Sequence, residues 1–366
     1  MERLRLLNGV LLAVLVMVGF PAQALGGEVQ EEEAARIEKL IDEASRFYCR
    51  GLKPPEAEWR KAEAAKKELV AMGQAAVPFL IEHVRNGDWT VAGIFCAMAP
   101  TGVPELVNLV KTDEDPEVRL MGAGVMAGLR AAKELARAEA VQALQDAARS
   151  DSDARVREQA LRSLDNLRVK VDKDVLLKAL GDEEAKVRRA AVCGVQTSLE
   201  KADAVQTLRA MTDDGSAEVR EAVGLTLCEY RDEAAIPLLL EAMDSATSWN
   251  GDPAMGQLER WFHLRFYGEG PGQTKHRHEM KQKWRTWWED NKAHIDQYFT
   301  ITIRPGDTFS GLATTIYKDD TPPGWGSDAK RRAAIMAANP GIEPTKLIDG
   351  QTLIIPRLKA LDPDKY

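Results

Sequence analysis

The sequence predicts a mainly α-helical protein, in which an array of stacked helix pairs is followed by a small α+β domain. A recurring motif predicts the array: an Asp, four further residues and Val-Arg at the start of a helical pattern. The four copies run from Asp113 to Arg119, Asp151 to Arg157, Asp182 to Arg188 and Asp214 to Arg220. Their Val residues lie 38, 31 and 32 residues apart. This period is typical of helix pairs that stack because no pair alone can bury its apolar face.

The residues around each Val repeat the same roles. Val156, Ala160 and Leu164 follow one another at helical spacing, so they share one apolar face. Three residues before each Val stands a candidate N-cap, and these are Asp115, Asp153, Glu184 and Ser216. We expect the first Asp of one copy to pair with the Arg of its neighbour, which gives a ladder of ion pairs. The alternative, a basic stripe for anionic ligands, is weaker because every Arg is matched by an Asp.

The motif resembles the HEAT repeat family, including the short HEAT-like repeats of the bilin lyase type. An Asp-rich turn, Val-Arg and a small residue one turn later carry the likeness, over about residues 75–244. The resemblance implies an α-solenoid of helix pairs, and it specifies an architecture better than an activity.

Composition and charge narrow the classes of function. The chain has 366 residues, of which 45% are hydrophobic, so it is long enough for two or three cores. The net charge of −8 argues against a protein that binds nucleic acid or an anionic membrane surface.

The first 24 residues have the pattern of a secretory signal. A basic start at Arg3 and Arg5 precedes an apolar run to Phe20, and Ala22-Gln23-Ala24 fits a cleavage site. The alternative is an uncleaved membrane anchor, but the run is shorter than the roughly 20 residues of a spanning helix. We therefore expect cleavage after Ala24, no membrane span in the mature chain, and export to the periplasm or cell envelope.

The cysteines are not expected to form disulfides or to hold a metal. Cys96, Cys193 and Cys228 each fall within a second helix of a repeat, where a thiol is an ordinary core residue, and Cys49 precedes the array. Their spacing fits no metal site, so the sequence predicts neither a metal nor a cofactor.

The array has expected boundaries on both sides. Residues 25–74 form an N-terminal helical capping region, with helices at 34–50 and 56–72 and a stop at Gly73. The repeats fill 75–248, and Val91-Ala92 marks a degenerate first copy.

A Trp-rich segment, 249–298, follows the repeats. One helix is expected to carry an apolar face of Trp284, Trp287, Trp288, Ile295 and Tyr298. Burial against the last repeat is the favoured role of this face, and a sugar-stacking surface is the alternative. The Lys275-His276-Arg277-His278 run is interpreted as a solvated basic turn, because His residues two apart do not share a helix face.

The apolar period changes at residue 299. Alternation over 299–304 and 351–356 predicts two strands, and helical spacing over 308–317 and 327–338 predicts two helices between them. This order, strand–helix–helix–strand, occupies a final domain at 299–358, before a tail at 359–366.

This final domain resembles the LysM family. The likeness is carried by Ile303 to Phe309, by Ile335 to Pro340 and by Leu347 to Pro356, in the family's order. It implies binding of glycans that contain N-acetylglucosamine, such as peptidoglycan or chitin. Trp325, in a long link between the two helices, is a candidate for a place where the family often has Trp.

The resemblance also implies a binding groove between two loops. Carried over, the glycan-binding residues are Gly306, Asp307, Thr308 and Phe309 in the first loop, and Asn339, Pro340, Gly341 and Ile342 in the second. Gly and Pro turns expose backbone groups that can bind an N-acetyl group, and apolar side chains can contact its methyl. Each residue also has a plain alternative, such as turn formation, helix capping or, for Phe309, a place in the core.

The sequence therefore predicts an exported scaffold or adaptor that binds peptidoglycan with its final domain and an unidentified protein with its repeats. A cell-wall enzyme that the final domain targets is one alternative, although no nucleophile or metalloprotease motif is present. A structural interaction protein whose final domain no longer binds glycan is the other. The sequence does not distinguish peptidoglycan from chitin, or identify the partner protein or the oligomeric state.

Overall fold

The computed structural model describes residues 27–45, 55–131, 134–245, 253–262, 273–318, 321–343 and 345–365. The chain divides into two compact units, residues 1–198 and 199–366, which are described separately below. The expected signal segment, Cys49 and Trp249 lie outside the described residues.

Two helices precede the repeats in the first unit. Helix α2 (Gly27–Ser45) packs against α3 (Glu56–Met72) and α4 (Val77–Arg85), and it buries Ile37 and Ile41. Helix α3 has the predicted bounds and ends at Gly73, whose φ of +58° is a left-handed conformation that favours glycine. Helix α2 begins before the predicted residue 34, and its predicted end at residue 50 lies outside the described residues.

A histidine joins α2 to the first repeat. His83 Nε2 lies 2.9 Å from Glu38 Oε2 of α2, and His83 Nδ1 lies 2.9 Å from Asp88 Oδ2. Both ring nitrogens can donate only in the imidazolium form, so the arrangement suits a protonated ring. The hydrogen bond with Glu38 is the largest cause that raises the pKa of His83, against the opposing effect of burial. This contact therefore holds α2 most strongly when His83 is charged.

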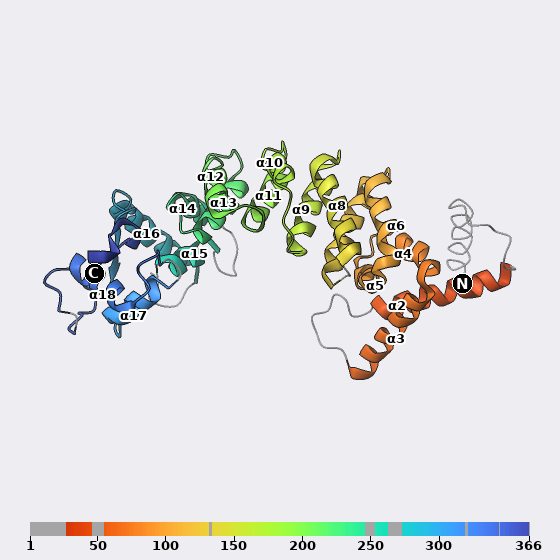
Figure 1. Cartoon of the computed structure of the whole chain (residues 1–366), viewed down its shortest axis with the longest axis horizontal. Coiled ribbons are helices and arrows are strands. Elements are labelled where there is room, and N and C mark those ends of the chain that lie inside the picture. The colour runs from red at the N-terminus through yellow and green to blue at the C-terminus, as the bar shows by residue number, and fades with distance from the viewer. Residues whose placement is uncertain are drawn as a thin grey trace. The chain divides into compact units, whose positions relative to one another are not determined.

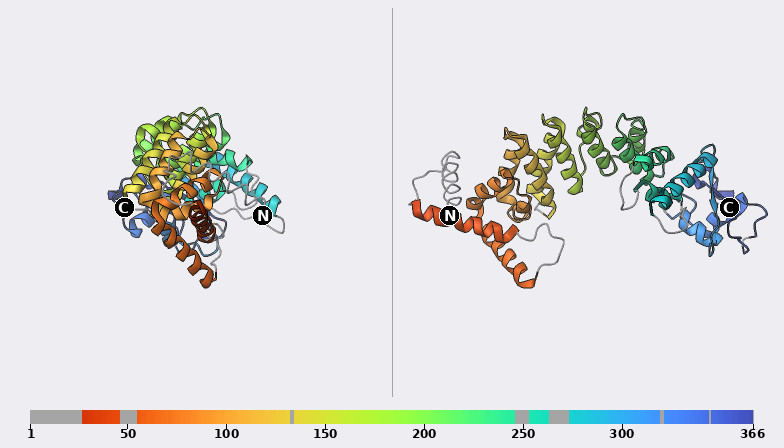
Figure 2. Two further views of the ribbon diagram at one scale, coloured as in Figure 1. Left: turned by 90° about the vertical axis from the view of Figure 1, so that its right-hand side faces the viewer. Right: turned by 180° about the vertical axis from the view of Figure 1, so that it is seen from behind.

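The first unit continues as antiparallel helix pairs, shown from orange to yellow-green in Figure 1. First helices of the pairs contact one another, as α6 does α8, and second helices do likewise, as α7 does α9. The helices are α5 (Ala92–Ala97), α6 (Ala99–Thr112), α7 (Pro116–Met126), α8 (Glu134–Ser150), α9 (Ala154–Asn166), α10 (Lys173–Leu180) and α11 (Ala185–Ser198). Three short 3-10 turns, η1 (Gly73–Ala76), η2 (Trp89–Val91) and η3 (Ala127–Ala131), join the early helices. The same two-layered stacking is visible from behind in Figure 2.

The motif residues bury the faces that the sequence predicted. Val156, Ala160 and Leu164 are fully buried, as is Val91 of the degenerate first copy. Close helix packing also requires glycine, because a Cβ on Gly124 of α7 would lie 1.7 Å from the Trp89 ring.

The second unit begins with the remaining repeat helices, α12 (Lys201–Arg209), α13 (Ala217–Glu229) and α14 (Ala235–Ser245). Helix α15 (Pro253–Phe262) packs on both α13 and α14, and α16 (Gln273–Asn291) packs on α14. The last repeat helix, α14, is therefore covered by helices of the Trp-rich segment.

An aromatic cluster forms this cover. Trp284 is fully buried, Trp287 is 8% exposed, and their rings meet edge to face with centroids 5.4 Å apart. The ring centroid of Phe262 in α15 lies 4.6 Å from that of Trp287 and 5.0 Å from that of Phe299 in the following domain. The prediction that this aromatic face is buried is confirmed for Trp284 and Trp287. The alternative prediction, an open surface on which sugars stack, is wrong for these two residues. Burial of these aromatic rings at the end of the repeats is favoured over their exposure to water.

Two details of the Trp-rich segment differ from the prediction. Helix α16 ends at Asn291 and does not continue through Ile295 and Tyr298. The buried Asn291 side chain ends the helix, because it forms hydrogen bonds with two backbone groups. Its Nδ2 donates to Trp287 O at 2.7 Å, and its Oδ1 accepts from Thr300 N at 2.7 Å. The Lys275 to His278 run lies within α16, so its interpretation as a turn is wrong.

The final domain has the predicted strand–helix–helix–strand order. Strands β1 (Tyr298–Thr302) and β2 (Thr352–Pro356) pair antiparallel, with Tyr298 opposite Pro356 and Thr302 opposite Thr352. Helices α17 (Phe309–Ile316) and α18 (Asp328–Ala338) follow β1 and precede β2 in the chain. The two helices pack together, and α18 contacts β2. Two short 3-10 turns, η4 (Leu358–Ala360) and η5 (Pro363–Lys365), follow β2. Trp325 is 1% exposed, as expected for a residue that fills the core of this domain.

The cysteine prediction holds only in part. Cys228 is buried, Cys96 is half-buried and Cys193 is exposed, and these three thiols are free. Cys193 lies on the outward side of α11 next to the buried Val192, so its assignment to the core is wrong. Within the described ranges, no three potential metal ligands lie together, and no helix is long and apolar enough to cross a bilayer.

Candidate functional site

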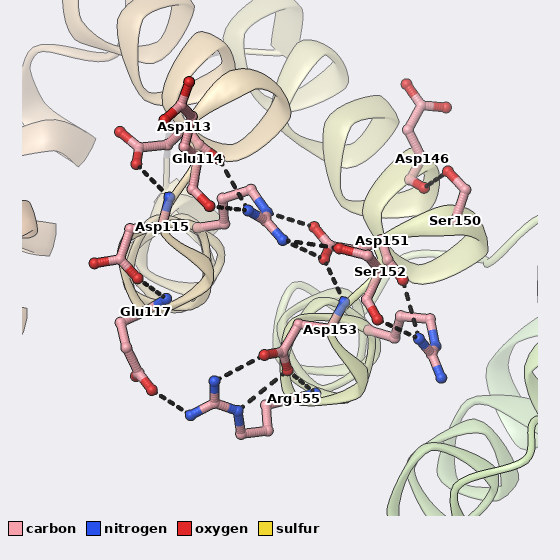
Figure 3. A network of polar contacts seen from close by, with 12 residues as sticks. Asp113, Glu114, Asp115, Glu117, Asp146, Ser150, Asp151, Ser152, Asp153 and Arg155 are labelled. Carbon is pink, nitrogen blue, oxygen red and sulfur yellow. Dashed lines mark hydrogen bonds and ion pairs between the residues drawn. The ribbon is translucent and has the colours of Figure 1, made fainter.

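The repeated motif builds a ladder of ion pairs at the turns between helices, and Figure 3 shows the part of it around Asp151. Arg119 Nε and Nη2 each donate to one carboxylate oxygen of Asp151 at 2.8 Å. Arg157 binds Asp182 of the next copy in the same bidentate geometry, again at 2.8 Å. The remaining terminal nitrogen, Nη1, donates to a carbonyl of the arginine's own turn, at 2.9 Å to Asp113 O for Arg119. The predicted pairing between neighbouring copies is confirmed for these two pairs.

Each ladder Asp also organises the turn in which it lies. Its Oδ1 accepts from the backbone amide two residues later, at 3.0 Å for Asp113 and 2.9 Å for Asp151. The N-caps at Asp115 and Asp153 then accept from the amides of Glu117 and Arg155. Among the described contacts, Ser216 makes no such side-chain bond, so its predicted capping role is wrong; Asp214 Oδ1 instead accepts from the Ser216 amide at 2.8 Å.

Electrostatics fit a structural role for the ladder. The hydrogen bond to Asp182 is the largest cause that raises the pKa of Arg157, and burial opposes it. Burial alone would raise the pKa of Asp182, but the bonds from Arg157 and the Glu184 amide lower it. The side chains of Arg157 and Asp182 are only 10% and 12% exposed. These guanidinium groups are committed to internal partners, and the alternative of an anion-binding stripe is not supported.

The first sequence-predicted glycan loop lies at the end of the two-stranded sheet where β1 ends, whereas Asn339 of the second loop bonds to Ile354 in the middle of β2. Strand β1 ends where β2 begins, and the contact continues past the strands: Ile303 N donates to Gln351 O at 2.8 Å, and Gly350 N donates to Ile303 O at 2.9 Å. The loop after β1 therefore lies beside the loop that leads into β2.

The first loop is a tight turn with its own small cavity. Asp307 Oδ2 accepts from Arg304 N at 2.9 Å, while Gly306 has a φ of +90° that favours glycine. Thr308 Oγ1 accepts from Gly311 N at 3.0 Å and caps α17. Gly306, Asp307 and Thr308 line a cavity of about 250 Å³, together with Ile301, Thr302, Arg304, Gly311, Leu312 and Thr315. Phe309 is 2% exposed and belongs to the core.

The second loop is anchored by one side chain. Asn339 Nδ2 donates to both Ile335 O and Ile354 O at 2.7 Å, and its Oδ1 accepts from Ile354 N at 2.8 Å. This amide holds the end of α18 against β2, and both hydrogens of its Nδ2 are donated to backbone carbonyls. Pro340 and Gly341 are exposed, with φ +96° at Gly341, and Ile342 is half-buried.

The structure thus brings Gly306, Asp307 and Thr308 together at one cavity, whereas none of the described residues that line it comes from the second loop. The sequence reasoning did not single out Thr315, which lines this cavity, or Ile348, which is 67% exposed in the loop before β2. Ile348 lies within the quoted family motif, and an apolar residue directly before the Asp349-Gly350 turn could have signalled an exposed loop tip.

Comparison with known proteins identifies the array. The family model for HEAT repeats matches residues 103–195 and 173–250. The chain therefore contains HEAT repeats over this region, as the sequence predicted. No curated protein sequence matches the chain.

Several solved structures have some likeness to the chain. The Escherichia coli protein YibA is 18% identical over 65% of this chain and 88% of its own, with a TM-score of 0.40. An engineered protein is 14% identical over 83% of this chain and 89% of its own, with a TM-score of 0.37. A designed armadillo repeat protein in complex with the peptide (KR)4 is 12% identical over 55% of this chain and 98% of its own, with a TM-score of 0.32.

Proposed function

We propose that this HEAT-repeat protein is an exported adaptor of the cell envelope. Its repeats dock a partner protein, and its final domain binds an N-acetylglucosamine glycan such as peptidoglycan. The observation that carries the proposal is the final domain itself: a strand–helix–helix–strand unit with the LysM motifs and a cavity of about 250 Å³ beside its first loop.

The HEAT repeats support the docking half of the proposal. Stacked repeats present a long continuous surface and commonly serve as scaffolds for other proteins. Their motif arginines bind neighbouring turns, so the partner is recognised by the outward side chains of the helices and not by the ladder.

A binding role fits the titration behaviour of the described residues better than catalysis does. Arg157, Asp182 and His83, whose pKa values are shifted, are held in ion pairs of the scaffold. Burial raises the pKa of Cys228 to about 12, which suppresses the thiolate that a nucleophile needs. Incubation with purified peptidoglycan should release no glycan or peptide fragments, and release of either would favour the enzyme alternative.

Glycan binding is tested with the full mature chain and protein-free sacculi. We expect retention of the wild type and loss of retention in Ile342→Asp, because a carboxylate replaces the half-buried apolar side chain of the second loop. Leu177→Asp is the matched control, since Leu177 is a 44% exposed apolar residue on repeat helix α10. Absence of retention for the wild type contradicts the proposal.

Export has a separate test. Expression of the complete sequence in cells with a secretion system should give an envelope protein whose first residue is Leu25. An intact N-terminus beginning at Met1 in the cytosol would contradict export and leave the glycan assay unaffected.

A second candidate is a purely structural final domain. Phe299 packs on Phe262 of the Trp-rich cover, and Trp287 Nε1 donates to Thr300 O at 2.8 Å, so the domain also seals the end of the repeats. If the folded wild type and Ile342→Asp are retained equally on sacculi, binding does not use the second loop and this candidate is favoured.

A further inference from the structure

A larger cavity, of about 690 Å³, lies in the second unit between repeat helices and the final domain. One wall comes from the end of α13 and from α15, and the other comes from the first loop and α17 of the final domain. Its volume falls in the range of small-molecule and peptide sites. Arg304 and Thr315 line both this cavity and the smaller one at the first loop, so the two cavities adjoin.

The walls of the cavity are held together by direct contacts. The Arg357 guanidinium stacks over the Trp261 ring at 5.5 Å, and its Nη2 lies 3.4 Å from Arg231 O. Lys359 Nζ lies 3.2 Å from Glu233 Oε2 at the start of the next repeat helix. A ligand that spans both cavities would therefore meet a preformed surface.

The lining is rich in cations although the whole chain carries a charge of −8. Four cationic side chains, Arg231, Arg260, Arg304 and Lys318, face two carboxylates, those of Glu229 and Glu259. Glu229 is already engaged, because Gln257 Nε2 donates to its Oε1 at 2.6 Å. The buried face of Trp261 supplies a low-dielectric wall, which strengthens the attraction of an anion.

We propose that this larger cavity binds carboxylates attached to the glycan that the first loop holds, so that the protein selects muramic acid-containing peptidoglycan over neutral chitin. The inference rests on the proposed glycan binding and adds the identity of the polymer. Two sources supply the same chemistry: the lactyl carboxylate of muramic acid residues without a stem peptide, and the carboxylates of the stem peptide where one is attached through the lactyl group. Arginine binds either in bidentate geometry.

Binding of the full mature chain to three soluble ligands of equal sugar number tests the proposal. These are a muropeptide oligomer with its stem peptides, the same sugar with the peptides removed so that the lactyl carboxylates remain, and an N-acetylglucosamine oligomer. We expect at least one of the two charged ligands to bind about tenfold more tightly than the neutral oligomer, with a difference that shrinks at high salt. The two charged ligands identify the source, because the lactyl carboxyl is an amide in the muropeptide and a free carboxylate only in the peptide-free sugar: tighter binding of the peptide-free sugar assigns the lactyl carboxylate, and tighter binding of the muropeptide assigns the stem peptide.

The pocket variant is the triple change Arg231→Gly, Arg260→Gln and Lys318→Gln, which leaves the shared residue Arg304 intact. Arg231 has a φ of +57°, so glycine removes its charge while fitting its backbone, and its carbonyl remains for Arg357. Arg168→Gly is the matched control, because Arg168 is exposed, has a φ of +53° and follows its own repeat helix at the same place in the first unit.

The pocket variant should bind all three ligands with the affinity that the wild type has for the neutral oligomer, and Arg168→Gly should behave as the wild type. The inference is overturned if the wild type binds the charged and neutral ligands equally, or if the pocket variant keeps the preference. Failure of the wild type to bind any of the three ligands overturns the proposed glycan binding itself, so the two failures are distinguishable.

Discussion

Removal of one arginine of the ladder should destabilise the repeats strongly. Arg157 makes two bonds of 2.8 Å to Asp182 and a third of 3.0 Å to Asp151 O, and its side chain is only 10% exposed. Arg157→Ala removes all of them and leaves the Asp182 carboxylate partly buried without this partner. Breaking a buried ion pair in this way typically lowers the free energy of unfolding by about 3–5 kcal/mol. Because Arg157 and Asp182 remain slightly exposed to solvent, we expect a loss of about 2–3 kcal/mol.

The matched control is Arg155→Ala, two residues earlier on the same helix. Arg155 also bridges two carboxylates, those of Asp153 and Glu117, but its side chain is 54% exposed, so its loss should change stability little. Urea unfolding followed by circular dichroism measures both variants, and hydrogen exchange locates the loss in α9 and α11, because repeat arrays can unfold locally.

A double variant separates the ion pair from simple packing. Replacing both partners, as in Arg157→Met with Asp182→Leu, should recover part of the loss, since an apolar pair leaves no charge in the interior. If Arg157→Ala costs no more than Arg155→Ala, the ladder does not stabilise the repeats and the reasoning is refuted.

Three further predictions concern other contacts. Because the pKa of His83 is raised, docking of α2 should be fully stable below about pH 6.5 and should weaken as pH rises through the folded pKa. Hydrogen exchange of α2 measures this pH dependence, which His83→Gln should remove. An unchanged pH profile in the variant would contradict the prediction. Gly224→Val should destabilise the second unit by about 1–3 kcal/mol in urea unfolding, since a Cβ at this position would lie 2.9 Å from Leu238 Cβ. Gly256→Ala should be neutral or stabilising, because the space around Gly256 is open. Equal effects of the two variants would contradict this packing argument. Asn339→Ala should cost about 2–3 kcal/mol and increase hydrogen exchange along β2, because it removes one bond to a buried backbone group and two to half-buried ones. Exchange as slow as in the wild type would refute that role.

Local patterns in the sequence predicted much of the fold. The Asp and Val-Arg motif carries its own turn bonds and N-caps, and it therefore predicted both the helix starts and the ladder of Arg119 and Arg157. Glu56 to Met72 was bounded correctly because Pro55 and Gly73 flank it. The strand–helix–helix–strand order followed from a change of apolar period.

The errors arose where long-range contacts decide the outcome. Helical spacing continued past Asn291, but this residue binds the backbone of β1 and ends the helix there. Cys193 followed the apolar pattern of its helix without reaching the interior. The cavity that joins Arg231 to Arg304 depends on how the final domain packs against α13 and α15, which no local pattern encodes.

Glycan binding by the final domain is the central claim, and hydrogen exchange of the full mature chain with and without a soluble peptidoglycan fragment tests it most directly. The account predicts slower exchange in the backbone of residues 304–308 and in the loop around 341–351, with repeat helices α6 to α11 unchanged. Slower exchange confined to those repeat helices, or an unchanged final domain at saturating fragment, would contradict it.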